Sequence, residues 1–158
     1  MNISRERTDT VIDSVISASR ALVAIAARSL SDVAEEVTLT QYRTLVVLAT
    51  RGPQNMAGLA EAVGVTPATA TRMCDRLVKK KLIIRRAERG DRRQVRLVLT
   101  KAGLDLVTAV MNRRRREIEK IVGAVPLADR EVLVQALSQF SAAAGEVPEQ
   151  DWSTGWDL

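Results

Sequence analysis

The sequence predicts a mainly α-helical fold with one small β-hairpin, and three observations support this class. Apolar residues recur at helical spacing over long segments at both ends of the chain. The period changes between residues 82 and 100, where β-branched and charged residues alternate. Aromatic residues make up only 3% of the 158 residues, so the core must be aliphatic, which suits helices packed on helices.

The N-terminal part of the chain predicts two helices. Residues 8–35 carry a broad apolar stripe without glycine or proline, which indicates one long helix whose stripe needs a partner to cover it. Thr40 is expected to cap a second helix that buries residues 45–48. This helix should end at Gly52 and Pro53, because both residue types stop helices.

Two short helices joined by a tight turn are predicted next. Asn55 caps the first, and Gly64 is placed to adopt the left-handed conformation at its end. Thr66 caps the second helix, with Pro67 at its first position. This arrangement is a helix-turn-helix. The core side of the second helix is expected to comprise Ala70, Met73, Leu77 and Val78.

After Leu82 the pattern predicts a β-hairpin. Val95, Leu97 and Leu99 should share one face of its second strand. Residues 87–94 are expected to form a long tip between the strands.

The C-terminal part predicts two more helices. Thr100 is expected to cap a helix over about residues 101–122, and Pro126 separates it from a last helix over about residues 127–144. The terminal helices carry more apolar stripe than one small domain needs, so we expect them to form a two-fold dimer interface. The final residues are acidic, contain both tryptophans and are expected to be loosely ordered.

Positive charge is concentrated in one segment of the chain. Residues 72–101 contain twelve of the 24 lysines and arginines and three acids, so this segment carries +9 and the rest of the chain −4. A solvated face would more often mix the two signs. A localised cationic patch is typical of a nucleic-acid binder.

Several function classes are excluded by composition. The chain has no histidine and one cysteine, Cys74, which removes most nucleophilic catalysis and the usual zinc sites. No glycine-rich phosphate loop occurs. We therefore expect no enzyme activity, cofactor or metal. Without an apolar run of about 18 residues or a signal pattern, we also expect a cytoplasmic protein without a membrane segment.

Three motifs occur in order between residues 59 and 103: “LAEAVGVTPATATRMCDRLVKKKLI”, “GDRR” and “VRLVLTKAG”. With the helices around them, they resemble the MarR family of winged-helix transcription regulators over nearly the whole chain. The chain departs from the family pattern at Lys81, where glycine is frequent, and at the wing tip, which lacks a proline. The resemblance implies four parts: an N-terminal dimerisation helix, a winged helix-turn-helix domain, C-terminal dimerisation helices and an acidic tail. Their ranges are 1–36, 37–100, 101–145 and 146–158.

The predicted function follows from the charge and the resemblance together. We expect a homodimeric repressor that binds a pseudo-palindromic operator in double-stranded DNA, with recognition helices about 34 Å apart. The resemblance implies release by a small aromatic or lipophilic ligand. An architectural DNA-binding protein without ligand control is the alternative, as is a thiol-based redox regulator acting through Cys74. Burial as a small core residue is the commoner role of a lone cysteine.

The candidate DNA-binding residues lie on the second helix of the helix-turn-helix and on the wing. The helix should enter the major groove, where arginine reads guanine, while its N-terminus binds phosphate. The wing arginines should reach the adjacent minor groove, with one of Arg92 and Arg93 anchoring the wing instead. The full set comprises Thr66, Thr69, Arg72, Arg76, Lys79, Arg89, Arg92 and Arg93.

Two acids are predicted to position these arginines. Asp75 is the one acid in a cationic helix. The resemblance implies that it pairs with a wing arginine, and we expect that arginine to be Arg93. Neutralisation of Arg72, three residues earlier, is the alternative. Asp91 is the second candidate for holding the wing.

The resemblance also implies a ligand site between the dimer helices and the winged domain. Its candidate residues combine that neighbourhood with polar reach: Arg20, Tyr42, Arg43 and Arg114. Arg114 interrupts an apolar stripe at a regular position. A buried pair that fixes helix register is favoured for it over a place in a cavity wall.

Overall fold

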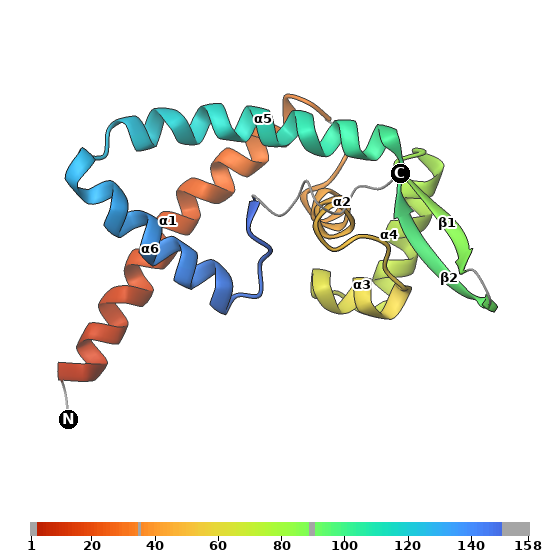
Figure 1. Cartoon of the computed structure of the whole chain (residues 1–158), viewed down its shortest axis with the longest axis horizontal. Helices are drawn as coiled ribbons and strands as arrows, with labels where there is room; N and C mark the ends of the chain where they lie inside the picture. Colours follow the sequence, from red (N-terminus) through yellow and green to blue (C-terminus); the bar gives the residue numbers. More distant parts are fainter. Residues whose placement is uncertain (1–2, 35, 89–90, 150–158) are drawn as a thin grey trace.

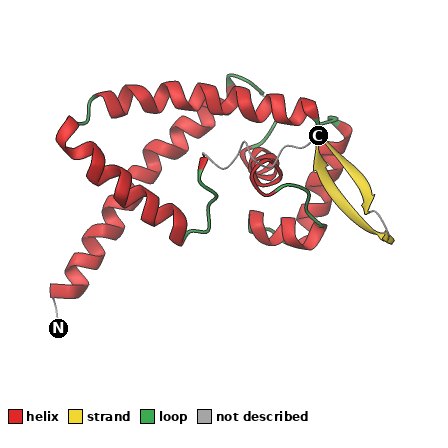
Figure 2. Cartoon of the chain, viewed as in Figure 1, coloured by secondary structure: helices red, strands yellow, loops and turns green. Residues whose placement is uncertain are grey.

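The computed structural model describes residues 3–34, 36–88 and 91–149, with the side chains of residues 3, 4, 88 and 91–93 left out. It confirms the mainly helical class with one two-stranded antiparallel hairpin (Figures 1 and 2). The elements in the described residues are α1 (Ile3–Ser31), α2 (Leu39–Arg51), α3 (Met56–Val63), α4 (Pro67–Lys79), β1 (Ile83–Glu88), β2 (Asp91–Leu99), α5 (Lys101–Gly123) and α6 (Leu127–Ala143).

The helix ends follow local capping chemistry, with one correction. Asn55 and Thr66 accept hydrogen bonds from backbone N–H groups of the first turns of α3 and α4, as predicted. Gly64 has φ of +76°, the left-handed conformation expected at the end of α3. The predicted cap Thr40 is wrong, because Thr38 caps α2. The Thr38 hydroxyl accepts a hydrogen bond from the Gln41 N–H at 3.2 Å, and the Gln41 side chain accepts one from the Thr38 N–H at 3.2 Å. This reciprocal pair is a capping box.

The hairpin is longer than the sequence indicated. The predicted eight-residue tip is wrong, because β1 runs to Glu88 and β2 begins at Asp91, with a register shift after Ala87. Backbone pairing continues there because a projecting two-stranded ribbon needs no buried side chains. Leu97 and Leu99 are buried, whereas Val95 is 45% exposed because it lies beyond the part of the strand that covers the core.

One aliphatic core holds α2, α3, α4, the base of the hairpin and the first half of α5 together. Leu45 and Leu48 from α2 lie at its centre and are almost completely buried. Gln54 exchanges two backbone hydrogen bonds with Leu97, which ties the loop before α3 to β2. The hairpin therefore projects from a fixed base beside α4 (Figure 1).

The terminal helices α1 and α6 extend away from this core (Figure 1). Both helices expose apolar side chains. α6 buries none of its residues, although Leu127, Val132, Val134, Leu137 and Phe140 are all large and apolar. Helix α1 contacts α5 and α2 but exposes most of its stripe. By length and composition alone, Arg5–Ser31 could cross a membrane, with a mean hydropathy of 1.5, but core helices of soluble proteins meet the same measure.

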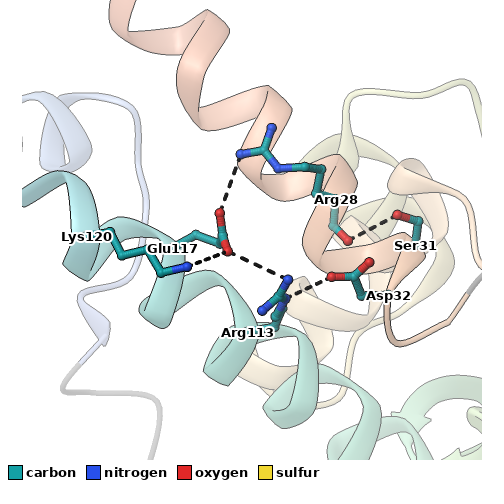
Figure 3. Close-up of polar contacts among 6 residues, drawn as sticks. All are labelled: Arg28, Ser31, Asp32, Arg113, Glu117 and Lys120. Atoms are coloured by element: carbon teal, nitrogen blue, oxygen red, sulfur yellow. Dashed lines mark hydrogen bonds and ion pairs between the residues drawn. The ribbon is translucent and has the colours of Figure 1, made fainter.

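An ion-pair network attaches α1 to α5 (Figure 3). Arg113 donates a 2.8 Å hydrogen bond to Asp32, and Glu117 lies 3.6 Å from Arg28 and from Lys120. Arg113 also lies 3.7 Å from Glu117 on its own helix. The network therefore joins the end of α1 to α5 at Arg113, the residue before Arg114.

Candidate nucleic-acid interface and cavity

Helix α4 divides cleanly into a buried and an exposed side. Ala70, Met73 and Leu77 are buried, as predicted, and Cys74 joins them, whereas Val78 is half-buried. On the other side Arg72, Arg76 and Lys79 are exposed. The sequence therefore places three cations on the free face of this helix.

The N-terminus of α4 is closed by two threonines. Thr66 is exposed, and its hydroxyl donates to Thr69 Oγ1 at 3.0 Å while accepting from the Thr69 N–H at 3.2 Å. The first backbone N–H groups of the helix lie at this end, where the helix dipole favours an anion.

Asp75 forms an ion pair with the wing, through Arg85 of β1. Arg85 Nη2 donates to Asp75 Oδ1 at 2.6 Å, and both side chains are about half exposed. The predicted partner Arg93 has a side chain outside the described residues. Sequence reasoning missed Arg85, although the strand predicted directly after α4 places it next to that helix.

The rest of the wing adds to the positive charge. Arg86 on β1 pairs in register with Arg96 on β2, and Arg86 is exposed. The predicted Arg89 lies outside the described residues, as do the side chains of Asp91, Arg92 and Arg93. Their assignments stay predictions.

A cavity of about 340 Å³ lies between α2 and α5. It brings together three of the four predicted ligand residues, namely Tyr42, Arg43 and Arg114, with an apolar wall that includes Val46 and Val63. Arg20 does not line it. Arg20 projects from the exposed part of α1 and donates to Ser17 on the same helix at 3.2 Å.

Tyr42 and Arg114 form the polar centre of this cavity. The Arg114 guanidinium carbon lies 5.7 Å from the centre of the Tyr42 ring, a cation–π contact. Burial raises the pKa of Tyr42 to about 12, although the positive charge of Arg114 opposes this. The expected buried ion pair of Arg114 is replaced, in the described residues, by this ring contact.

Two polar atoms of this centre lack partners. Within the described part of the chain, the Tyr42 hydroxyl and Arg114 Nε are buried without a hydrogen bond. Such groups are costly unless a ligand or water satisfies them. Tyr42 and Arg114 therefore place two unsatisfied polar atoms next to the apolar wall of the cavity.

A second cavity, of about 360 Å³, shares Arg114 with the first. Its wall includes Met111, Ile118 and Val122 from α5, and Arg115 and Glu149 at its polar edge. Arg114 thus contributes to the walls of both cavities.

Cys74 is a free, fully buried thiol. Burial raises its pKa to about 11, outweighing the opposite effect of Arg85. The thiol is therefore protonated near neutral pH, when it is a poor nucleophile.

Comparison with known proteins agrees with this architecture. The MarR family model matches residues 37–95. The HTH-type transcriptional repressor NicR of Pseudomonas putida is 30% identical over 105 residues, which are 66% of each chain. The crystal structure of RV1404 from Mycobacterium tuberculosis is 44% identical, with a TM-score of 0.84, and the match covers 90% of this chain and 97% of that one.

A third relative concerns ligand control. The structure of BpsR from Bordetella bronchiseptica, which describes regulation of its DNA binding by 6-hydroxynicotinic acid, is 25% identical with a TM-score of 0.62. The match covers 83% of this chain and 92% of that one.

The fold and the cationic helix-and-hairpin surface define a winged helix-turn-helix transcription regulator, not an enzyme. The chain belongs to the MarR family.

Proposed function

We propose that this regulator is a homodimeric, sequence-specific repressor that binds a pseudo-palindromic operator in double-stranded DNA and acts in the cytoplasm. The observation that carries the proposal is the free cationic face of α4, joined by the Asp75–Arg85 ion pair to a cationic hairpin. Positive charge is confined to this surface, because the rest of the chain is net negative. The surface therefore complements a groove lined with phosphates. The repressor role is supported by the likeness to NicR.

In this proposal α4 lies in the major groove. Arg72 and Arg76 reach base edges or flanking phosphates, with Thr69 beside them and Thr66 at the helix N-terminus next to a phosphate. Lys79 contacts phosphate, which positions the helix without specifying sequence.

The hairpin lies across the neighbouring minor groove. Arg89, Arg92 and Arg93 are its proposed contacts, and Asp75 and Asp91 hold the wing in place. Arg85 takes an anchoring role towards Asp75, which the sequence had assigned to Arg93.

The homodimer is supported by the uncovered apolar faces of α1 and α6. Val11, Val23, Val132 and Leu127 are between 56% and 79% exposed. Pairing these faces around a two-fold axis would remove them from water, which is the main driving force for association.

The cavity around Tyr42 is the proposed effector site. A small aromatic acid would place its carboxylate against Arg43 or Arg114 and its ring on the apolar wall, and BpsR gives a precedent for such control. Effector binding is proposed to release the operator.

Competition binding tests the DNA-binding proposal. Footprinting upstream of the protein's own gene and of divergent genes identifies the operator, and random DNA then competes with it. We expect the operator to bind at least about a thousandfold more tightly. A ratio near one would instead support the architectural alternative. Peroxide treatment that abolished operator binding would support the thiol-based one, against which the buried, protonated Cys74 argues.

A further inference from the structure

The chain turns back after α6 and reaches the winged domain (Figure 1). Gly145 has φ of +72°, and the Glu146 N–H donates to the Ser141 carbonyl at 3.0 Å, which closes the helix end. This closure fixes the direction in which the next residues leave α6. We call residues 145–149 the C-terminal strap.

The strap contacts two arginines of α2. Both carboxylate oxygens of Glu146 accept hydrogen bonds from Arg43, from Nη1 at 3.1 Å and from Nη2. Arg51 Nη2 donates to the Gly145 carbonyl at 3.1 Å. A two-point arginine–carboxylate pair is the strongest and most specific form of this contact.

The strap also reaches α5. Glu149 lies 3.8 Å from Arg115 and lines the 360 Å³ cavity together with Arg114. The negative charge of Glu149 raises the pKa of Tyr42, whereas the positive charge of Arg114 lowers it. The two carboxylates of the strap thus face the arginines that border both cavities.

We propose that the C-terminal strap is a built-in carboxylate ligand of Arg43 and Arg115 that competes with an anionic effector. The proposal rests on the effector site proposed above, because Arg43 lines that cavity and is already occupied by Glu146. An effector carboxylate that takes Arg43 must displace Glu146. The free chain is therefore held in a self-liganded state.

Displacement of the strap has a consequence beyond the cavity. The strap links α6, in the proposed dimer region, to α2 in the winged domain. Its release would loosen the winged domain relative to the dimer helices, and the spacing of the two recognition helices depends on that relation. The effector then weakens operator binding through the strap.

Hydrogen exchange of the free protein tests the docking of the strap. Glu146→Gln removes the charge at constant size, and Glu131→Gln removes one charge from an exposed position on α6 as the matched control. We expect amides of residues 144–149 to exchange about threefold faster in the Glu146→Gln variant and unchanged in the control. Equal exchange in all three proteins would overturn the proposal.

Ligand competition tests the second part, with 6-hydroxynicotinate as the probe and 6-hydroxynicotinamide as its uncharged control. The acid should speed exchange of the strap in the wild type and bind Glu146→Gln about threefold more tightly. The amide should do neither. Equal affinity for both proteins, or no binding of the acid to Glu146→Gln, would refute competition. Operator binding is also measured without the probe. Failure of the DNA-binding proposal can then be distinguished from failure of the strap proposal.

Discussion

The Asp75 carboxylate accepts a 2.6 Å hydrogen bond from Arg85, which joins the exposed side of α4 to the first strand of the hairpin. Both side chains are about half exposed, so the pair adds little to the free energy of unfolding. We propose that its effect is geometric and that it sets the angle between the two elements that are proposed to contact DNA.

Asp75→Asn is expected to lower operator preference rather than stability. The free energy of unfolding should fall by less than about 1 kcal/mol. The ratio of operator to random-DNA affinity should fall several-fold, because the wing loses its anchor. Asp105→Asn is the control, since it removes the same charge from an exposed pair with Lys101 on α5. An unchanged ratio relative to this control would contradict a positioning role.

Arg76→Ala and Lys79→Ala are expected to weaken DNA binding in different ways, because Arg76 is proposed to contact a base and Lys79 a phosphate. Loss of a base contact by Arg76 should weaken operator binding by about 1–3 kcal/mol and leave random DNA less affected. Loss of a phosphate contact by Lys79 should weaken both DNAs alike and reduce the salt slope by about one. Fluorescence anisotropy over a salt series measures both quantities. Identical behaviour of the two variants would refute the division of roles.

Local chemistry was predicted from the sequence, and contacts between distant segments were not. Asn55, Gly64 and Thr66 were placed correctly because capping depends on neighbours within one turn. The cap of α2 was wrongly placed at Thr40, because Thr38 and its reciprocal partner Gln41, three residues later, were overlooked.

The hairpin and the cavity show where local patterns end. The alternation of Val95, Leu97 and Leu99 predicted the second strand, but the pairing of Arg86 with Arg96 depends on the register, which no local pattern gives. The contact of Tyr42 with Arg114 joins α2 to α5, so the family resemblance could nominate these residues but not their geometry. The ion pair of Arg85 is likewise a product of packing.

Stability should fall at alkaline pH through Cys74. Burial raises the pKa of this thiol from 9.0 to about 11, so its contribution is complete below about pH 9 and is lost as pH rises through 11. By pH 10.5 the wild type should lose about 2 kcal/mol more than Cys74→Ala, measured by urea unfolding. Tyr42 titrates in both proteins and cancels in the comparison. Parallel pH profiles would show that the thiol is solvated.

Tyr42→Phe is expected to stabilise the free protein and to weaken ligand binding. The change removes a buried hydroxyl without a described partner, so the free energy of unfolding should rise by about 1 kcal/mol. Ser29→Ala is the control, because its hydroxyl is equally buried and unpartnered but lines neither cavity. Binding at the proposed effector site, probed with 6-hydroxynicotinate by calorimetry, should weaken only in Tyr42→Phe. Destabilisation by that variant would mean that the hydroxyl already has a partner.

Phe140→Glu is expected to disrupt the homodimer, whereas Gln139→Glu is not. Phe140 is 54% exposed and lies one turn from Leu137, which is 49% exposed, so a two-fold interface over α6 would bury both. A carboxylate there would lose hydration without a partner, at a cost of several kcal/mol. Gln139 is an exposed neighbour of Phe140, so Gln139→Glu introduces the same charge at a position that stays in water. Sedimentation at micromolar concentration should give a monomer for Phe140→Glu and a dimer for Gln139→Glu.

The same pair of variants connects assembly to DNA binding. A monomer keeps α4 and the hairpin intact but offers only one recognition helix, so it should bind a half-site and the full operator with nearly equal affinity. The Gln139→Glu dimer should retain the advantage that linking two sites confers, about a hundredfold or more. Because the cationic surface is unchanged in both proteins, a loss confined to the full operator would locate the defect in the interface. A dimeric Phe140→Glu protein would instead place the interface away from this face of α6.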